Sequence, residues 1–180
     1  MESNILICGD PGVGKSTLID RLLAADGRPV SGFRTRKLPP GPDGICEVIL
    51  FPAAGGPASG AVRIGRCRDR ILETDPEAFE TLGVRLIREA RPGTILVMDE
   101  LGRMESEAAA FQREVLKALD GPVPVLAAVK SLRNVPFLDR IRESRDSDLY
   151  RIDRENRDAL AETLLREIRE RKERRERADR

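Results

Sequence analysis

Short apolar runs alternate with longer amphipathic stretches along most of the chain. The runs at 5–8, 94–98 and 123–129 are mostly hydrophobic, which is typical of parallel strands buried on both faces. The stretch at 76–91 instead places apolar side chains three to four residues apart, as amphipathic helices do, and a helix-like stretch also occupies 15–25. This alternation predicts an α/β domain with a largely parallel sheet flanked by helices.

The segment 29–68 has a different pattern and is expected to be an antiparallel β-hairpin insert. Two strand-like runs, 31–37 and 45–51, are separated by the turn formers of 39–44. Residues 52–60 are small or apolar and carry no charge, so we expect a mobile loop there.

The rest of the chain continues the alternation of strands and helices. Asp75 is expected to cap the 76–91 helix, with Pro76 at its first position, and Asp153 to cap a long C-terminal helix. We expect a single domain over 1–168, followed by a charged helix end over 169–180. The remaining expected elements are helices at 106–119 and 136–143 and a strand at 149–152.

A glycine-rich sequence links the first expected strand to the first expected helix. It fits the pattern G-x-x-x-x-G-K-[ST], and this strand–loop–helix context is the one in which the pattern binds phosphate. Glycines permit positive φ, so consecutive N–H groups can surround phosphate oxygens at a helix N-terminus. Lys15 is expected to contact the β- and γ-phosphates, and the Ser16 hydroxyl to bind Mg²⁺. The loop residues are Gly9, Asp10, Pro11, Gly12, Val13, Gly14, Lys15, Ser16 and Thr17.

Two adjacent carboxylates follow the apolar strand at 94–98. Asp99 is expected at the strand's carboxyl end, where it can hold Mg²⁺ directly or through a water. Because neighbouring strand residues point to opposite sides, Glu100 is predicted to be free of the metal and to act as general base toward a water in line with the γ-phosphate. The alternative for Glu100 is a solvated loop carboxylate. Arg103 either offsets charge on the γ-phosphate or is an ordinary surface side chain.

Composition narrows the chemistry and the partners. With 32 Lys and Arg against 31 Asp and Glu, the net charge of +1 gives no global attraction to nucleic acid or membranes, and no apolar run could span a bilayer. The chain has no histidine, which excludes histidine bases and histidine-ligated metals. Cys8, Cys46 and Cys67 fit neither a disulfide framework nor a zinc pattern. Without a secretory signal, we expect a cytoplasmic protein.

The C-terminal residues 166–180 are dense in charge. A nucleic-acid-binding arm is one interpretation. The run has almost no apolar residues, and four Glu–Arg pairs have the i,i+4 spacing that stabilises a helix by about 0.2–0.5 kcal/mol per pair. We therefore favour a solvated, fraying helix end. The pairs are Glu167/Arg171, Glu170/Arg174, Glu173/Arg177 and Glu176/Arg180.

With both motifs in place, the chain resembles the small nucleoside-triphosphatase family first noted in thermophiles. The resemblance extends to about Ile168. It is carried by residues 9–18, 32–35, 99–105 and 155–158, of which the last two segments are the more specific. It implies a RecA-like P-loop NTPase fold with an added β-hairpin. It also implies slow, Mg²⁺-dependent hydrolysis of ATP, GTP and other ribonucleoside triphosphates, CTP and UTP included, to the diphosphate and phosphate.

The resemblance also assigns residue roles. Lys15 and Ser16 would bind phosphate and metal, Asp99 would support the metal, and Glu100 would be the general base, as the motifs alone suggest. Arg103 takes the place of a lysine that is common in the family.

Two further positions depart from the family. Arg34 and Arg36 stand where the family usually has an aromatic and an acidic residue, which leaves the base preference open. The chain has only six aromatic residues, one tyrosine and five phenylalanines, so base stacking is poorly provided for.

Three functions compete at this point. The first choice is a monomeric nucleoside-triphosphate hydrolase without a nucleic-acid partner, because Glu100 lies beside Asp99. A nucleotide or small-molecule kinase has a suitable size and fold, but no arginine-rich lid is obvious. A nucleotide-dependent switch or assembly factor would use slow turnover as a timer and the 52–60 loop as a partner surface.

Overall fold

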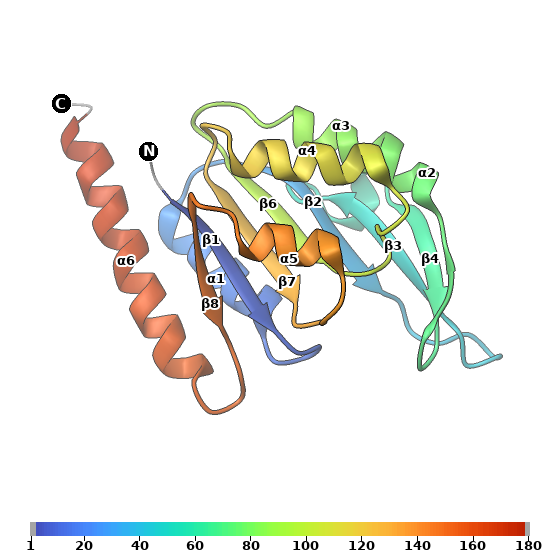
Figure 1. Ribbon diagram of the computed structural model, residues 1–180. Coiled ribbons are helices and arrows are strands. Elements are labelled where there is room, and N and C mark those ends of the chain that lie inside the picture. Colours follow the sequence, from blue (N-terminus) through green and yellow to red (C-terminus); the bar gives the residue numbers. More distant parts are fainter. Residues whose placement is uncertain (1–2, 179–180) are drawn as a thin grey trace.

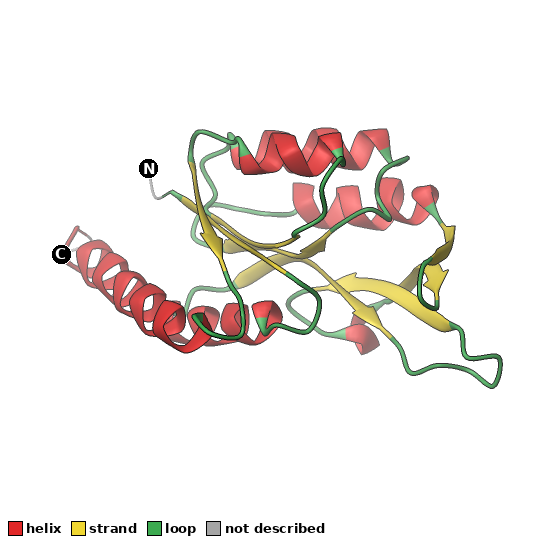
Figure 2. Ribbon diagram, turned by 60° about the horizontal axis from the view of Figure 1, so that its bottom comes forward, coloured by secondary structure: helices red, strands yellow, loops and turns green. Residues whose placement is uncertain are grey.

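The computed structural model describes residues 3–178, in which one sheet of eight strands lies between two layers of helices (Figure 1). Figure 2 shows α1 (Lys15–Asp26), α6 (Arg157–Ala178) and a short 3-10 turn on one face of the sheet, and the other helices on the opposite face. The strands are β1 (Asn4–Gly9), β2 (Val30–Lys37), β3 (Cys46–Pro52), β4 (Val62–Cys67), β5 (Ile71–Thr74), β6 (Ile95–Leu101), β7 (Val125–Lys130) and β8 (Ser147–Arg151). The helices are α1 (Lys15–Asp26), α2 (Pro76–Ala78), α3 (Val84–Arg88), α4 (Ala109–Leu119), α5 (Pro136–Arg142) and α6 (Arg157–Ala178), with a 3-10 turn at Pro57–Ser59 and a π-helical turn at Phe79–Gly83.

The sheet has a parallel and an antiparallel half. Its order is β5-β4-β3-β2-β6-β7-β1-β8, and all neighbours from β2 to β8 in this order are parallel. The largely parallel α/β sheet predicted from the sequence is therefore confirmed. β7 lies between β1 and β6, so the carboxyl ends of these strands share one edge of the sheet, where α/β proteins bind their ligands.

The antiparallel half is larger than a single hairpin. β2 pairs in parallel with β6 and antiparallel with β3, and β4 and β5 then continue the antiparallel run. The sequence did not predict β4 or β5, because β4 alternates apolar and charged residues around Gly65 and β5 is mostly exposed. The 52–60 segment contains the 3-10 turn rather than only irregular loop.

Two hydrophobic clusters pack against the two faces of the sheet. On one face, Phe111 of α4 contacts Phe33 and Phe79, with ring centroids 5.3 and 5.1 Å apart. On the other face, α1 and α6 bury leucines such as Leu22 and Leu164 against β1 and β7. All six residues of β1 are buried, as expected for a strand covered on both faces.

Of the two expected helix caps, Asp75 is confirmed and Asp153 is not. Asp75 caps α2, accepting a hydrogen bond from the Ala78 N–H at 3.1 Å, as predicted. Asp153 lies four residues before α6 and does not cap it. Its carboxylate accepts from the N–H groups of Glu155 and Asn156, which forms a turn that leads into the helix.

The charged helix end is partly docked rather than fully solvated. Arg171 donates to the Ser3 carbonyl at 2.8 Å, and Arg175 forms an ion pair with the buried Asp26 at 2.9 Å. The prediction of a solvated end was therefore wrong for these two arginines. Residues 1–2 and 179–180, with Arg180 of the expected Glu176/Arg180 pair, lie outside the described residues. Among the helices of residues 3–178, none is long and apolar enough to cross a membrane.

Candidate active site

The glycine loop joins β1 to α1 at the carboxyl edge of the sheet. Gly12 and Gly14 have positive φ values of 75° and 111°, which other residues rarely adopt. A Cβ atom on Gly9 would lie 2.5 Å from the Ile152 carbonyl oxygen, so this position has no room for a side chain. α1 begins at Lys15, so the last three residues of the loop motif form its first turn, with the unpaired N–H groups and the partial positive charge of the helix N-terminus. The loop thus has the backbone of an anion site.

The ammonium group of Lys15 is fixed inside this loop. The residue is only 5% exposed, and Nζ donates to the carbonyl oxygens of Gly9 and Asp10 at 2.8 and 2.9 Å. The Glu100 Oε1 atom lies 3.2 Å from the same Nζ. A single cation therefore connects the glycine loop to the acidic end of β6.

Ser16 and Asp99 also connect these two segments. The Ser16 hydroxyl donates to Asp99 Oδ1 at 2.9 Å. Burial raises the pKa of Asp99, while the Ser16 hydrogen bond and the positive charge of Arg34 act in the opposite direction. A hydroxyl and a carboxylate oxygen this close are the hard donors that Mg²⁺ prefers. Residues 3–178 contain no cluster of three or more His, Cys, Asp or Glu side chains that could hold a metal.

Glu100 faces the loop as well. The register between β6 and β7 shifts between Asp99 and Leu101, so Glu100 is an extra residue outside the regular alternation. Its N–H donates to the Thr35 hydroxyl at 3.2 Å. The Oε1 atom is buried and accepts no hydrogen bond within residues 3–178, although Lys15 is its ion-pair partner. A buried carboxylate oxygen with spare acceptor capacity is a suitable proton acceptor.

Arg34 is a site residue that the motif analysis did not assign. It is the register partner of Asp99 across the parallel β2–β6 pair. One guanidinium nitrogen lies 3.4 Å from Asp99 Oδ2 and another 2.6 Å from Asp20 Oδ1 on α1. The signal in the sequence was weak, because which strand lies beside β6 cannot be read from local pattern.

The segment after β6 contains one buried and one exposed charged side chain of interest. Glu105 is fully buried and accepts a hydrogen bond from the Gly102 N–H, and burial raises its pKa to about 7. Arg103 is exposed, and its side chain makes no hydrogen bond or ion pair in the described part of the chain. The structure therefore brings Lys15, Ser16 and the acidic pair together but leaves Arg103 at the surface.

Within residues 3–178, the side chains of the remaining loop residues form no hydrogen bond or ion pair with the acidic pair. Asp10 accepts a hydrogen bond from the Ser131 hydroxyl, beyond the end of β7, which ties the loop to a third strand. Val13 is buried, and Pro11 and Thr17 are exposed.

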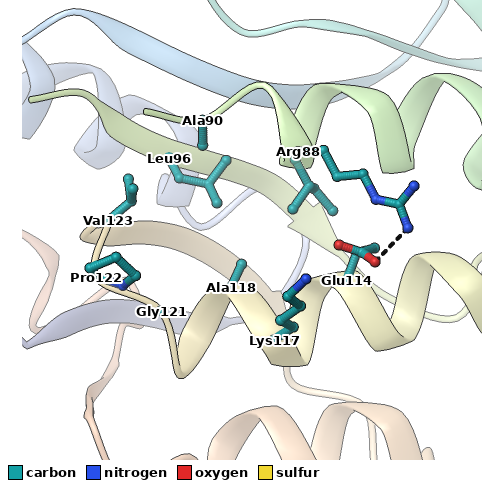
Figure 3. A pocket seen from close by; sticks show the side chains of 10 residues that line it. Arg88, Ala90, Leu96, Glu114, Lys117, Ala118, Gly121, Pro122 and Val123 are labelled. Carbon is teal, nitrogen blue, oxygen red and sulfur yellow. Dashed lines mark hydrogen bonds and ion pairs between the residues drawn. The ribbon is translucent and has the colours of Figure 1, made fainter. Parts of the chain in front are cut away.

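Two cavities differ in their relation to this loop. One of about 490 Å³ adjoins it and is lined by Asp10, Pro11, Val13, Ile152, Asp153, Arg154 and Glu155. The other, of about 250 Å³, lies between α3, α4 and the start of β6, beside the 2.7 Å ion pair of Arg88 and Glu114 (Figure 3). The second cavity shares no lining residue with the glycine loop.

The fold and this site together define a P-loop nucleoside-triphosphate-binding protein. The glycine loop lies between β1 and α1, and the carboxylates at the end of β6 reach its lysine and serine. β7 separates the two strands that carry these motifs.

Comparisons with known proteins identify the family. The family model described as NTPase matches residues 4–165. The nucleoside-triphosphatase THEP1 of Natranaerobius thermophilus is 31% identical, covering 94% of this chain and 98% of the relative. The cancer-related nucleoside-triphosphatase of Homo sapiens is 29% identical, covering 92% and 96%. The crystal structure of THEP1 from Aquifex aeolicus matches with a TM-score of 0.73 at 23% identity, covering 92% and 98%. The chain therefore belongs to the NTPase family, and the expected P-loop NTPase fold is confirmed.

Proposed function

We propose that this nucleoside-triphosphatase hydrolyses ATP, GTP, CTP and UTP to the nucleoside diphosphate and phosphate, with Mg²⁺ as cofactor. The observation that carries the proposal is the convergence of two distant segments. Lys15 lies 3.2 Å from Glu100, and Ser16 lies 2.9 Å from Asp99. A phosphate-binding loop alone would only bind nucleotide, whereas an acidic pair within reach of it can also act on the γ-phosphate.

Glu100 is proposed as the general base. Its carboxylate accepts a proton from a water as the water oxygen bonds to the γ-phosphorus. The bond from that phosphorus to the bridging oxygen breaks, and its electron pair leaves with the diphosphate. In the free enzyme Lys15 pairs with this carboxylate. The negative charge of bound phosphate draws Lys15 toward the substrate, which leaves Glu100 free to take the proton.

Ser16 and Asp99 are proposed to hold Mg²⁺. When bound, the ion neutralises charge on the β- and γ-phosphate oxygens. Burial raises the pKa of Asp99, so a cation at this carboxylate would stabilise its ionised form.

The cavity beside the loop is the proposed place of the nucleoside. Its lining residues Asp153, Arg154 and Glu155 precede α6 and are exposed and polar, and no aromatic ring lines it. Polar side chains without an aromatic ring to stack on the base do not favour one base strongly over another. This lining therefore supports hydrolysis of nucleotides with several different bases.

A cytoplasmic location and a monomeric state belong to this proposal as predictions. The three cysteines are all free, which supports a reducing compartment.

A matched pair of variants tests the catalytic role. Glu100→Gln keeps the shape of the side chain but cannot accept a proton, so turnover of ATP and GTP is expected to fall by about 10²- to 10⁴-fold. Nucleotide binding, measured by calorimetry with ADP, is expected to persist. The exposed Glu107, in the segment that follows β6, is the control, and Glu107→Gln should keep the parent rate. A Glu100→Gln enzyme that hydrolyses both nucleotides at the parent rate would refute the mechanism.

A further inference from the structure

Arg34 brings a positive charge to the carboxylate that is proposed to hold the metal. One guanidinium nitrogen lies 3.4 Å from Asp99 Oδ2, while Asp99 Oδ1 accepts from Ser16 at 2.9 Å. The two oxygens of one buried carboxylate are thus divided between an arginine and the serine of the glycine loop. We propose that Arg34 competes with Mg²⁺ for Asp99 and thereby sets the metal concentration that the enzyme requires. The inference rests on the proposed metal role of Asp99.

The sheet fixes Arg34 in this position. Arg34 and Asp99 are register partners in the adjacent parallel strands β2 and β6, so their Cα atoms face each other at the carboxyl edge. The Arg34 side chain is only 18% exposed and that of Asp99 only 5%. Backbone pairing therefore holds the two Cα atoms at neighbouring positions, from which the guanidinium reaches the carboxylate.

The Arg34 guanidinium and a Mg²⁺ ion would repel each other at Asp99. Burial penalises the ionised form of Asp99, and Arg34 offsets part of that penalty in the free enzyme. A divalent ion at the same carboxylate would repel the guanidinium, and the partly buried setting screens this repulsion less than open water would. Binding of Mg²⁺ must therefore weaken the contact between Arg34 and Asp99.

Asp20 is already a second partner of Arg34 in the free protein, and this ion pair can remain when the metal binds. Its Oδ1 atom lies 2.6 Å from the other terminal nitrogen of Arg34, and its side chain is 61% exposed on α1. Arg34 can therefore keep one ion pair while it releases Asp99. This alternative partner lowers the cost of displacing Arg34, so Asp20 is expected to favour metal binding without touching the metal.

The test measures binding rather than turnover. The affinity for ADP is determined by titration calorimetry in EDTA and at increasing concentrations of free Mg²⁺. The quantity compared between variants is the Mg²⁺ concentration at which ADP affinity has risen halfway from its value in EDTA to its value at saturating Mg²⁺. Arg34→Gln is expected to lower this concentration at least about fivefold, the lower end of typical coupling between two ligands. Asp20→Asn is expected to raise it, because Arg34 then has only Asp99. The double variant is expected to behave like Arg34→Gln alone.

Arg36 provides a matched control for charge. It lies two residues along β2, is exposed, and its guanidinium lies over the Phe51 ring, 5.3 Å from the centroid. Arg36→Gln removes the same charge from the same strand but no contact with Asp99, so the Mg²⁺ requirement is expected to stay at the parent value.

The possible failures are distinguishable. If the parent responds to Mg²⁺ and Arg34→Gln has the same or a higher requirement, the competition is refuted while the proposed function stands. If Asp20→Asn lowers the requirement, or acts equally with and without Arg34, the role of Asp20 as second partner is refuted. If ADP affinity of the parent ignores Mg²⁺, the metal role in the proposed function fails, and this inference fails with it.

Discussion

Charged side chains of α1 and β2 form ion pairs with the two carboxylates at the end of β6. Lys15 pairs with Glu100 and Arg34 pairs with Asp99, so two ion pairs lie side by side between the glycine loop and the edge of the sheet. Substrate adds negative charge and metal adds positive charge beside these pairs. The free enzyme therefore holds its reactive groups in pairs that the substrate and metal must exchange for new ones.

Glu105 gives a pH dependence of stability. Burial raises its pKa to about 7 from an ordinary value of 4.5, so the folded chain binds more protons than the unfolded chain between these values. Its contribution is therefore favourable at low pH and is lost as pH rises toward 7. Glu105→Gln keeps an acceptor for the Gly102 N–H but cannot ionise.

Urea unfolding of parent and Glu105→Gln at pH 5, 6, 7 and 8 measures this effect. The variant is expected to gain stability relative to the parent as pH rises, by up to roughly 3 kcal/mol between pH 5 and 8. A stability difference that stays constant over this range would contradict the buried-acid interpretation.

Among the helices, Gly83 is a position where tight packing against Phe111 outweighs the preference of helices for alanine over glycine. It lies in the π-helical turn before α3, and a Cβ there would meet two ring atoms of Phe111 at 2.8 Å. Phe111 is fully buried between Phe33 and Phe79 and cannot move aside. Alanine is favoured over glycine in helices by about 1 kcal/mol, but overpacking costs about 1–3 kcal/mol.

Gly83→Ala is therefore expected to lower the free energy of unfolding by about 1 kcal/mol. Denaturant unfolding of the variant and the parent measures the change. A more stable variant would show that the Phe111 ring yields, contrary to the packing described here.

The end of α6 is expected to contribute to stability through Asp26. Burial favours the neutral acid, but the hydrogen bond and charge of Arg28 and the charge of Arg175 outweigh it and lower the pKa of Asp26. The ionised group therefore stabilises the fold above the ordinary value of 3.8, and this contribution is lost as pH falls through the lowered pKa.

Asp26→Asn is expected to cost about 1–3 kcal/mol at pH 7, because hydrogen bonds to a buried charged group are lost. The difference from the parent should shrink in acid, below the ordinary carboxyl pKa. Thermal unfolding at pH 7 and pH 3 tests this, and an equal cost at both values would exclude the charge as its origin.

The sequence predicted the parallel half of the fold better than the antiparallel half. β1, β6 and β7 are continuous apolar runs, so burial on both faces is visible locally. β4 and β5 are short, partly exposed and charged, so only their partners reveal them. Similarly, the motifs predicted Lys15 and Asp99, whereas Arg34 and Asp20 became site residues only through strand register and the packing of α1.

For the whole molecule, one edge of the sheet collects the functional groups. β1, β2, β6 and β7 all end there, and the antiparallel half extends the sheet beyond β2 without adding a residue to the acidic pair. The residues proposed to carry out hydrolysis therefore lie in the parallel half of the sheet and in the glycine loop beside it.

The glycine loop and the acidic pair are proposed to act together on one magnesium-bound triphosphate. The test is to measure phosphate and nucleoside diphosphate formed from ATP, GTP, CTP and UTP by the purified protein. Each reaction is run with Mg²⁺ and with EDTA, in the absence of any phosphoryl acceptor. With Mg²⁺, each of the four nucleotides is expected to yield phosphate and the nucleoside diphosphate in equal amounts, and no release is expected with EDTA. Release that persists in EDTA, or that requires an added acceptor as a kinase would, would contradict this proposal.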